Sequence, residues 1–380
     1  MRGHFAKRGS SWYYWAELPP GPDGRRRQKS KGGFATKREA MDAYEELCAS
    51  LHSGTYIASS KRSLGAYLVG EWLPAMRATV RSSTLDHYAT QVTSYVVPRM
   101  GGVGLQRLGS ARLNAFYADL LADGRADGTG GLSPKSVRHV HTMLHKALAD
   151  AVRWGLLAKN PADAADPPKP ARTEMKVWEP AQLRTFLDHV ANDRLYAAWM
   201  LLVTTGMRRG EVIGLRWSDV DLPNRRVSVV QTLTSVDYKV VVSKPKTARG
   251  RRAVALDVAT AAALKAHGTL QKRERLARGE TWIDSGLVFT REDGAPLHPH
   301  RFSEWFVKLA AEAGLPRIRL HDLRHSYATA ALAVGIPAKI VSERLGHASI
   351  AITLDTYSHV LPSMQVDAAE KVAGLILGTA

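Results

Sequence analysis

Four short motifs bring together side chains that could carry out chemistry on a phosphodiester. His321 and Arg324 belong to His-Asp-Leu-Arg-His, His347 ends Leu-Gly-His, and Tyr357 is the second residue of Thr-Tyr-Ser-His. Upstream, Arg208 is the first arginine of Thr-Gly-Met-Arg-Arg-Gly-Glu. A guanidinium group matches the geometry of phosphate oxygens and keeps its charge, and a tyrosine oxygen can attack phosphorus. Arginines, histidines and a tyrosine without a cluster of metal ligands therefore indicate phosphodiester chemistry.

The order of these motifs resembles that of the tyrosine recombinases, and in particular of phage-type integrases. The resemblance implies that Tyr357 attacks DNA and forms a covalent 3′-phosphotyrosine intermediate. It also implies that Arg208 and Arg324 hold the non-bridging phosphate oxygens, and that Glu211 orients the first of these arginines. The intermediate retains the energy of the phosphodiester, so rejoining needs neither ATP nor a metal ion. We expect no cofactor.

The same resemblance assigns the remaining proton transfers and phosphate contacts. His347 donates a further hydrogen bond to the phosphate, and His321 either helps the tyrosine to lose its proton or holds the phosphate. Lys246, in a Lys-Pro-Lys-Thr turn, protonates the departing 5′-oxygen, with Lys244 as the competing choice. A basic hairpin tip that holds phosphate without chemistry is the other interpretation of this turn.

Helical spacing gives some of these residues a structural alternative. His321 and Arg324 are three apart on one face near a predicted helix N-terminus, a natural anion site. His325 projects about 100° away from Arg324, so we expect it to pack or to support the site. Tyr357 continues an apolar stripe and, taken alone, reads as a core tyrosine. The Leu-Gly-His and His-x-x-Arg motifs that precede Tyr357 favour a role as nucleophile over a purely structural one. Arg209 lies on another helix face than Arg208 and is less suited to the same phosphate.

Charge and composition favour nucleic acid as the partner. The 380 residues carry a net charge of +18 and a pI near 10.0, and a surface this positive attracts polyanions. Neither end has the basic amphipathic helix that an acidic membrane would bind. No apolar run approaches the length of a bilayer span. The N-terminus is basic but lacks an apolar h-region, so we expect no secretory signal. Cys48 is the only cysteine, which excludes an internal disulfide and a cysteine-based zinc site. We expect a bacterial cytosolic, nucleoid-associated protein.

Residues 1–60 are predicted to form a small basic domain of two strands and one helix. The strands cover 11–17 and 25–30, and Thr36 with Glu39 forms a capping box at the start of the helix. This segment is similar to the arm-binding domain of phage integrases. A solvated basic hairpin is the alternative. The DNA-contacting residues expected here are Arg25, Arg26, Arg27 and Lys29.

Residues 63–160 are predicted to form four helices, with Pro74 and Pro98 ending the first two. Ser133 and Pro134 open the fourth, whose basic face carries Lys135 and Arg138. The set resembles a core-binding domain that clamps DNA. Three histidines on this last helix lack the spacing of a zinc site, so we expect them to face DNA or solvent; they are His139, His141 and His145.

A proline-rich linker over 161–175 separates a catalytic domain at 176–380. This domain is expected to contain helices and a meander of strands over 226–233, 238–243 and 252–256. The predicted fold class is α+β and mostly helical. It comprises an N-terminal sheet with one helix, an all-α core-binding domain, and a mixed α/β catalytic domain with a small antiparallel sheet.

The expected function is a site-specific integrase that inserts, and also excises, a phage or mobile element. The resemblance implies a homotetramer on double-stranded DNA at core and arm sites, with room for a host bending factor and an excision helper. Residues 361–380 would dock on a neighbouring protomer or on their own domain. The competing functions are a type IB topoisomerase and a catalytically silent DNA-binding regulator. Segment 1–60 argues against the topoisomerase, and the full set of chemical side chains argues against the regulator.

Overall fold

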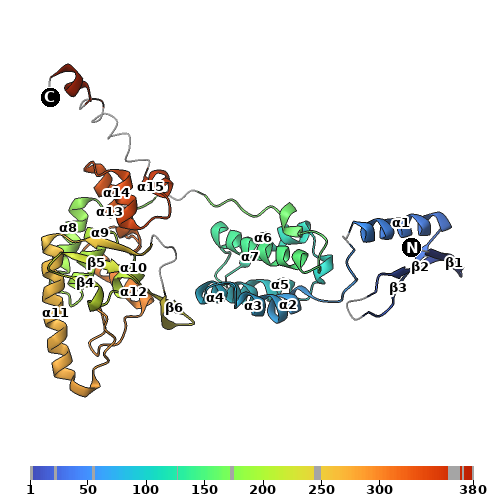
Figure 1. Cartoon of the computed structure of the whole chain (residues 1–380), viewed down its shortest axis with the longest axis horizontal. Coiled ribbons are helices and arrows are strands. Elements are labelled where there is room, and N and C mark those ends of the chain that lie inside the picture. Colours follow the sequence, from blue (N-terminus) through green and yellow to red (C-terminus); the bar gives the residue numbers. More distant parts are fainter. Residues whose placement is uncertain are drawn as a thin grey trace. The chain divides into compact units, whose positions relative to one another are not determined.

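The computed structural model describes residues 3–20, 24–53, 56–125, 127–171, 175–243, 250–357, 369 and 372–378. The chain divides into two compact units, Met1–Ala171 and Arg172–Ala380. Figure 1 shows that helices dominate both units and that the strands form small sheets. Among the described residues, no helix combines the length and the apolar character that a bilayer crossing requires.

The first unit begins with a three-stranded antiparallel sheet covered by one helix. The elements are β1 (Gly3–Arg8), β2 (Ser11–Leu18), β3 (Arg27–Phe34) and α1 (Lys37–His52). Tyr14 and Leu47 pack together between sheet and helix. The sequence predicted β2, β3 and α1 but missed β1, which contains few β-formers and is held by its pairing with β2. Thr36 accepts the N–H of Glu39, as predicted, whereas the Glu39 carboxylate accepts from Ala35.

A helical bundle completes the first unit. Its elements are α2 (Leu64–Tyr67), the π turn η1 (Leu68–Trp72), α3 (Leu73–Met76), α4 (Ser82–Gln91), the π turn η2 (Val92–Val96), α5 (Val97–Met100), η3 (Leu105–Arg107), α6 (Ser110–Asp123), α7 (Pro134–Arg153) and η4 (Pro161–Ala164). Ser133 caps α7 as predicted, because its hydroxyl accepts the N–H of Ser136. The buried Asp150 of α7 accepts the indole N–H of Trp72 at 2.8 Å, which ties α7 to η1.

Two prolines lie inside helical runs that they were predicted to end. The chain continues past Pro74 to the end of α3, and past Pro98 to the end of α5. A π turn precedes each proline, so that the N–H of Leu73 donates to the carbonyl of Leu68, five residues back. This shift of the hydrogen-bond ladder accommodates the proline ring and its missing N–H. The prediction that Pro74 and Pro98 end these helices is therefore wrong.

The second unit surrounds a separate core with helical segments and strands that precede the C-terminal residues. They are α8 (Pro180–His189), α9 (Tyr196–Thr205), α10 (Arg209–Ile213), η5 (Trp217–Asp219), β4 (Val220–Asp221), β5 (Arg226–Val229), β6 (Thr232–Val236), β7 (Lys239–Ser243), β8 (Arg252–Ala255), α11 (Val258–Arg278), η7 (Gly279–Thr281), α12 (Pro299–Glu312), α13 (Asp322–Ala333), α14 (Ala338–Leu345) and α15 (Ile350–Tyr357). The apolar helix α9 lies at the centre of this core and packs against α11 and α13. Helices α13, α14 and α15 enclose a smaller apolar cluster that contains Leu332 and Leu345.

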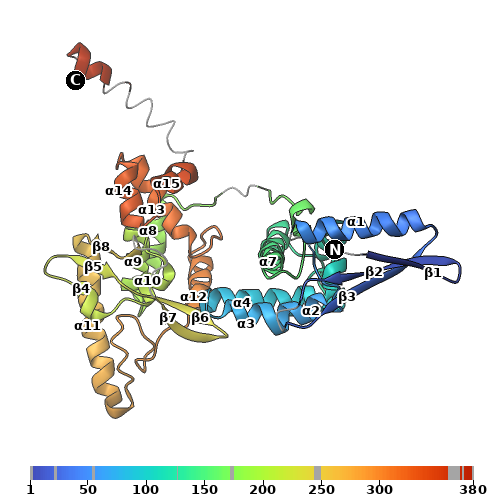
Figure 2. The same ribbon diagram turned by 45° about the vertical axis from the view of Figure 1, so that its right-hand side comes forward.

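The strands of the second unit form a sheet in the order β4-β5-β8 and a separate β6-β7 hairpin, which Figure 2 shows projecting from the unit. The predicted three-strand meander is therefore wrong in topology. Its first stretch breaks after Val229, and Gln231 then donates its side-chain N–H to the carbonyl of Gly214. Gly214 allows β6 to approach α10 closely, because an added Cβ would lie 2.9 Å from the N atom of Leu233. The hairpin packs on α10 instead of extending the sheet, and β8 pairs with β5.

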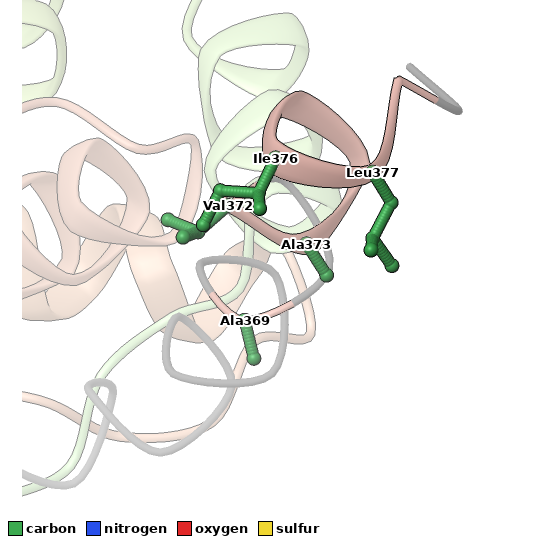
Figure 3. Close-up of a pocket in the computed structure, with 5 residues that line it drawn as sticks. All are labelled: Ala369, Val372, Ala373, Ile376 and Leu377. Carbon is green, nitrogen blue, oxygen red and sulfur yellow. The ribbon is translucent and has the colours of Figure 1, made fainter.

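The described C-terminal residues form a helical turn with an apolar face. Its residues line the pocket of Figure 3, and all of them are apolar: Ala369, Val372, Ala373, Ile376 and Leu377. The side chains of Leu375, Ile376 and Leu377 are exposed to solvent. This face is therefore not covered by the described part of its own chain.

Gly206 ends α9 in a conformation that only glycine adopts without strain. Its φ is +64°, and an added Cβ would lie 2.6 Å from the Tyr327 ring and 2.7 Å from Leu345. Gly314 has nearly the same φ, +67°, but open space around it. We expect Gly206→Ala to lower the free energy of unfolding by at least about 3 kcal/mol, since strain and overpacking add. Gly314→Ala should cost only about 1–2 kcal/mol.

Urea unfolding of the two variants checks this prediction. Equal losses in the two variants would show that Tyr327 and Leu345 move aside and that the close contacts carry no cost.

Candidate active site

A buried carboxylate lies between two arginines at the N-terminus of α10. Glu211 accepts the backbone N–H of Arg208 at 2.9 Å and its Nη1 at 2.8 Å. From β8, Arg252 donates to both Glu211 oxygens, at 3.1 and 2.9 Å. The side chains of Glu211 and Arg252 are only 5% and 7% exposed. Burial alone would raise the pKa of Glu211, but the hydrogen bonds and charges of Arg252 and Arg208 outweigh it and lower the pKa.

Backbone carbonyl oxygens at helix C-termini accept further hydrogen bonds from the guanidinium groups of Arg324 and Arg208. Arg324 of α13 is buried and donates to the carbonyl oxygens of Gly206, at 2.9 Å, and Leu345, at 2.6 Å. Arg208 donates to the carbonyl of Gly346 at 3.3 Å. Gly206 and Gly346 are the left-handed C-caps of α9 and α14, so these carbonyls belong to the partially negative ends of two helices. They orient both arginines without neutralising them.

The positive charges of the arginines in this cluster therefore exceed the negative charge that surrounds them. In the described part of the chain, Arg208, Arg252 and Arg324 are gathered around one carboxylate, that of Glu211. Burial and then the charge of Arg208 lower the pKa of Arg324. A buried guanidinium in such surroundings gains from an anion, and its planar donors fit a phosphate.

Two imidazoles border this cluster. His347 follows α14, and its Nδ1 lies 2.8 Å from the hydroxyl of Thr353. Burial, followed by the charges of Arg324 and Arg208, lowers the pKa of His347 to about 4, so the ring is neutral at pH 7. His321 precedes α13 and is exposed. Burial of part of the ring and the charges of His325, Arg324 and Arg208 also lower its pKa, and solvent weakens that effect.

Tyr357 is both a core residue and a member of the site. Its side chain is 1% exposed and packs in the cluster of α13, α14 and α15, as its place in the apolar stripe predicts. Its hydroxyl lies 2.8 Å from Nδ1 of His325. Burial raises the pKa of Tyr357 to about 12, and the charge of Arg324 opposes this shift. The phenol is therefore close enough to the guanidinium cluster to respond to its field.

The structure gathers the predicted residues of the second unit that it describes. Electrostatic and hydrogen-bond contacts link six of them: Arg208, Glu211, His321, Arg324, His347 and Tyr357. Lys246 and its alternative Lys244 lie outside the described residues. Arg209 donates to Ser303 instead, on another face of α10, as expected.

The predicted DNA-contacting residues belong to the first unit. Lys135 and Arg138 are exposed on α7, and Arg25 and Arg27 are exposed beside or on β3. Arg26 pairs with Glu17, and Lys29 lies 4.8 Å from the centre of the Tyr56 ring. Of the three histidines on α7, His141 contacts the hydroxyl of Tyr117 at 2.8 Å and His145 pairs with Asp163. His139 is exposed and lies edge-on to the ring of His87.

Sequence reasoning missed two residues of the site. Arg252 opens a strand and has no motif around it, so nothing in its spacing indicates that it reaches Glu211. His325 was expected to pack or to support, but it contacts the Tyr357 hydroxyl directly. A signal existed for His325, because residues 321 and 325 are four apart and share a helix face.

We expect Arg252→Met to lower the free energy of unfolding by about 3–5 kcal/mol, because it removes one of the two arginines that hold the buried Glu211 carboxylate. The control is Arg226→Met, which breaks an exposed pair with Asp221 and should cost about 0–1 kcal/mol. Chemical denaturation measures both. A loss for Arg252→Met no larger than the control would show that Arg208 alone satisfies the carboxylate.

This geometry gathers three guanidinium groups beside a buried tyrosine, and comparison with known proteins identifies the family. Residues 176–364 match the phage integrase family, and residues 4–51 match an arm DNA-binding domain. The XerC-like tyrosine recombinase of Caldanaerobacter subterraneus subsp. tengcongensis is 28% identical over 362 residues, 90% of each chain. The ICEBs1 integrase of Bacillus subtilis is 31% identical over 255 residues, 65% of this chain and 67% of that protein. The chain belongs to the phage integrase family and is a tyrosine recombinase.

Solved structures share the fold at low sequence identity. The Tn1549 transposon integrase, in complex with transposon right end DNA, gives a TM-score of 0.67 at 20% identity, over 82% of this chain and 99% of that chain. A lambda integrase tetramer bound to a Holliday junction gives a TM-score of 0.58 at 16% identity, over 91% and 93%. The predicted α+β, mostly helical fold class is confirmed.

Proposed function

We propose that this recombinase is a site-specific integrase that cleaves and rejoins DNA through a 3′-phosphotyrosine intermediate. The observation that supports it most is the excess of guanidinium groups around one carboxylate, next to the Tyr357 phenol. A DNA phosphate would supply the missing negative charge and place its phosphorus near the phenol oxygen. No comparable reason exists for an uncharged ligand to occupy this cluster.

In the proposed reaction, the Tyr357 oxygen attacks phosphorus while the bond to the 5′-oxygen breaks. Arg208 and Arg324 stabilise the charge that grows on the non-bridging oxygens, and each such donor is worth roughly a few kcal/mol. His347 adds a hydrogen bond, and Lys246 or Lys244 protonates the leaving oxygen. The phosphotyrosine bond stores the energy of the broken phosphodiester, so a new 5′-hydroxyl can reverse the reaction without ATP.

We propose double-stranded DNA as the partner of both units. Exposed basic side chains of β3 and α7, the match to an arm DNA-binding domain and the net charge of +18 support contacts at arm and core sites. Relatives named as integrases of Mycobacterium phages and of ICEBs1 support the integration and excision of a phage or mobile element. The site of action would be the nucleoid in the bacterial cytosol, with a host bending factor and an excision helper as further partners.

We propose that four copies act together on two duplexes. The lambda integrase tetramer on a Holliday junction is a precedent with the same fold. The exposed apolar face at Leu375, Ile376 and Leu377 supports docking of the C-terminal segment on a neighbouring protomer over docking on its own domain. The proposed divisions are an arm domain at 1–60, a core-binding domain at 63–160, a linker at 161–175 and a catalytic domain at 176–380.

Covalent capture tests the reaction. The substrate is a pool of labelled duplexes that tile the DNA flanking the gene and carry single nicks at staggered positions, so that the short 5′-hydroxyl fragment diffuses away after cleavage. We expect a protein–DNA adduct that survives denaturation with the wild type and is absent with Tyr357→Phe. Sequencing the trapped duplex identifies the core site. An absence of adduct on every duplex would support the silent regulator, and relaxation of arbitrary supercoiled plasmid by a monomer would support the topoisomerase.

A second variant separates phosphate positioning from DNA affinity. Arg208→Lys keeps the charge but loses the planar fork, so we expect the rate of adduct formation to fall at least about a hundredfold while DNA affinity changes only a few fold. Arg209→Lys, at a residue that donates to Ser303, is the matched control and should cleave at nearly the wild-type rate. A collapse of DNA affinity with Arg208→Lys, with an unchanged rate for the bound fraction, would make Arg208 a binding residue only.

A further inference from the structure

We propose that His325 is the catalytic residue that accepts the proton of Tyr357, a role distinct from that of His321; this inference rests on the proposed phosphotyrosine reaction. The geometry points to it directly. The phenol oxygen of Tyr357 lies 2.8 Å from Nδ1 of His325, within the range required of a general base. Within the part of the chain that the structure describes, this imidazole is the hydrogen-bond partner of that hydroxyl.

Burial decides which of the two groups donates. The Tyr357 side chain is 1% exposed, so its O–H needs an acceptor within the protein. Nδ1 of His325 meets this need only in its unprotonated form, with the ring hydrogen on Nε2. Burial, which is partly offset by Asp322, lowers the pKa of His325, so the ring is neutral and basic at pH 7. The resting site therefore already has the hydrogen bond along which the proton would move.

His321 is placed for a different task. Its ring meets that of His325 edge-on, with centroids 5.2 Å apart, and it feels the charges of Arg324 and Arg208. It therefore borders the guanidinium side of the site, where the phosphate would lie, while His325 faces α15. The groups that act on His325 are Tyr357 of α15, His347 after α14, Arg319 before α13, and His321, Asp322 and Arg324 around the start of α13.

The step balances as follows. The Tyr357 proton moves to Nδ1 of His325, which becomes an imidazolium, and the phenol electron pair forms the bond to phosphorus. The P–O5′ bond breaks, and the leaving oxygen takes its proton from Lys246 or Lys244, as in the proposed function. Religation reverses each transfer, so His325 returns its proton to the released phenol. A phenol with a pKa near 12 is almost fully protonated at neutral pH, so a base in contact with it has a large effect.

The test compares two replacements of His325. Leucine removes the acceptor, whereas asparagine offers an amide oxygen that keeps a hydrogen bond but is not basic. With the duplex trapped by the wild type, we expect both variants to form the adduct about a hundredfold or more slowly at pH 7.5. Their rates should rise about tenfold per pH unit between pH 7 and 10, because only spontaneously formed phenolate reacts. The wild-type rate should stay flat over that range.

A duplex with sulfur in place of the bridging 5′-oxygen separates the two proton transfers. Its thiolate leaves without a proton, so it should restore Lys246→Ala but should not restore His325→Leu. His321→Leu should keep the flat pH profile. DNA affinity and the unfolding midpoint of each variant establish that it is folded.

Three results would overturn the assignment of His325. The first is a rate of adduct formation within threefold of wild type for His325→Leu. The second is a return to the wild-type rate when asparagine replaces His325. The third is rescue of His325→Leu by the thio-substituted duplex. An absence of adduct with the wild type is a different result, because it contradicts the proposed function itself.

Discussion

The carboxylate of Glu211, buried between Arg208 and Arg252, is the interaction on which the site depends. Burying an ion pair costs desolvation free energy. Glu211 recovers it through three hydrogen bonds from the two guanidinium groups and a fourth from the backbone N–H of Arg208. One carboxylate cannot balance three arginines. Carbonyl oxygens at the C-termini of α9 and α14 therefore complete the set of acceptors, and they supply partial charge only. The unbalanced positive charge is the basis on which we propose that the site binds a phosphate.

The fold of the second unit brings helix ends together. The C-termini of α9 and α14 meet the N-termini of α10 and α13, so two partially negative ends face two arginines carried by positive ends. Left-handed glycines at residues 206 and 346 turn the chain at these points. Helix ends are rigid and carry unpaired backbone groups, which suits a site that must hold a charged ligand in one orientation.

Burial of Tyr357 is compatible with both interpretations of this residue, as a core tyrosine and as the proposed nucleophile. The apolar packing of α13, α14 and α15 fixes the ring, and the same burial keeps the phenol protonated until a base acts on it. The neighbouring histidine contacts the hydroxyl, and the charge of Arg324 opposes the rise in the pKa of the phenol; in the proposed reaction both favour loss of the proton. A core position thus gives the hydroxyl a defined direction, towards Nδ1 of His325.

The sequence alone determined the family motifs, the α+β class, most helix positions and six residues of the cluster, because those signals are local: periodicity, caps and short strings. It failed where the outcome depends on contacts between distant segments. The strand topology turned on the close approach of β6 to Gly214, and the helices through Pro74 and Pro98 depended on π turns stabilised by packing. Arg252 reaches Glu211 across 41 residues of chain, and His325 meets Tyr357 across 32. Only tertiary structure decides such pairs, because a side chain carries no local mark of a partner that folding brings to it.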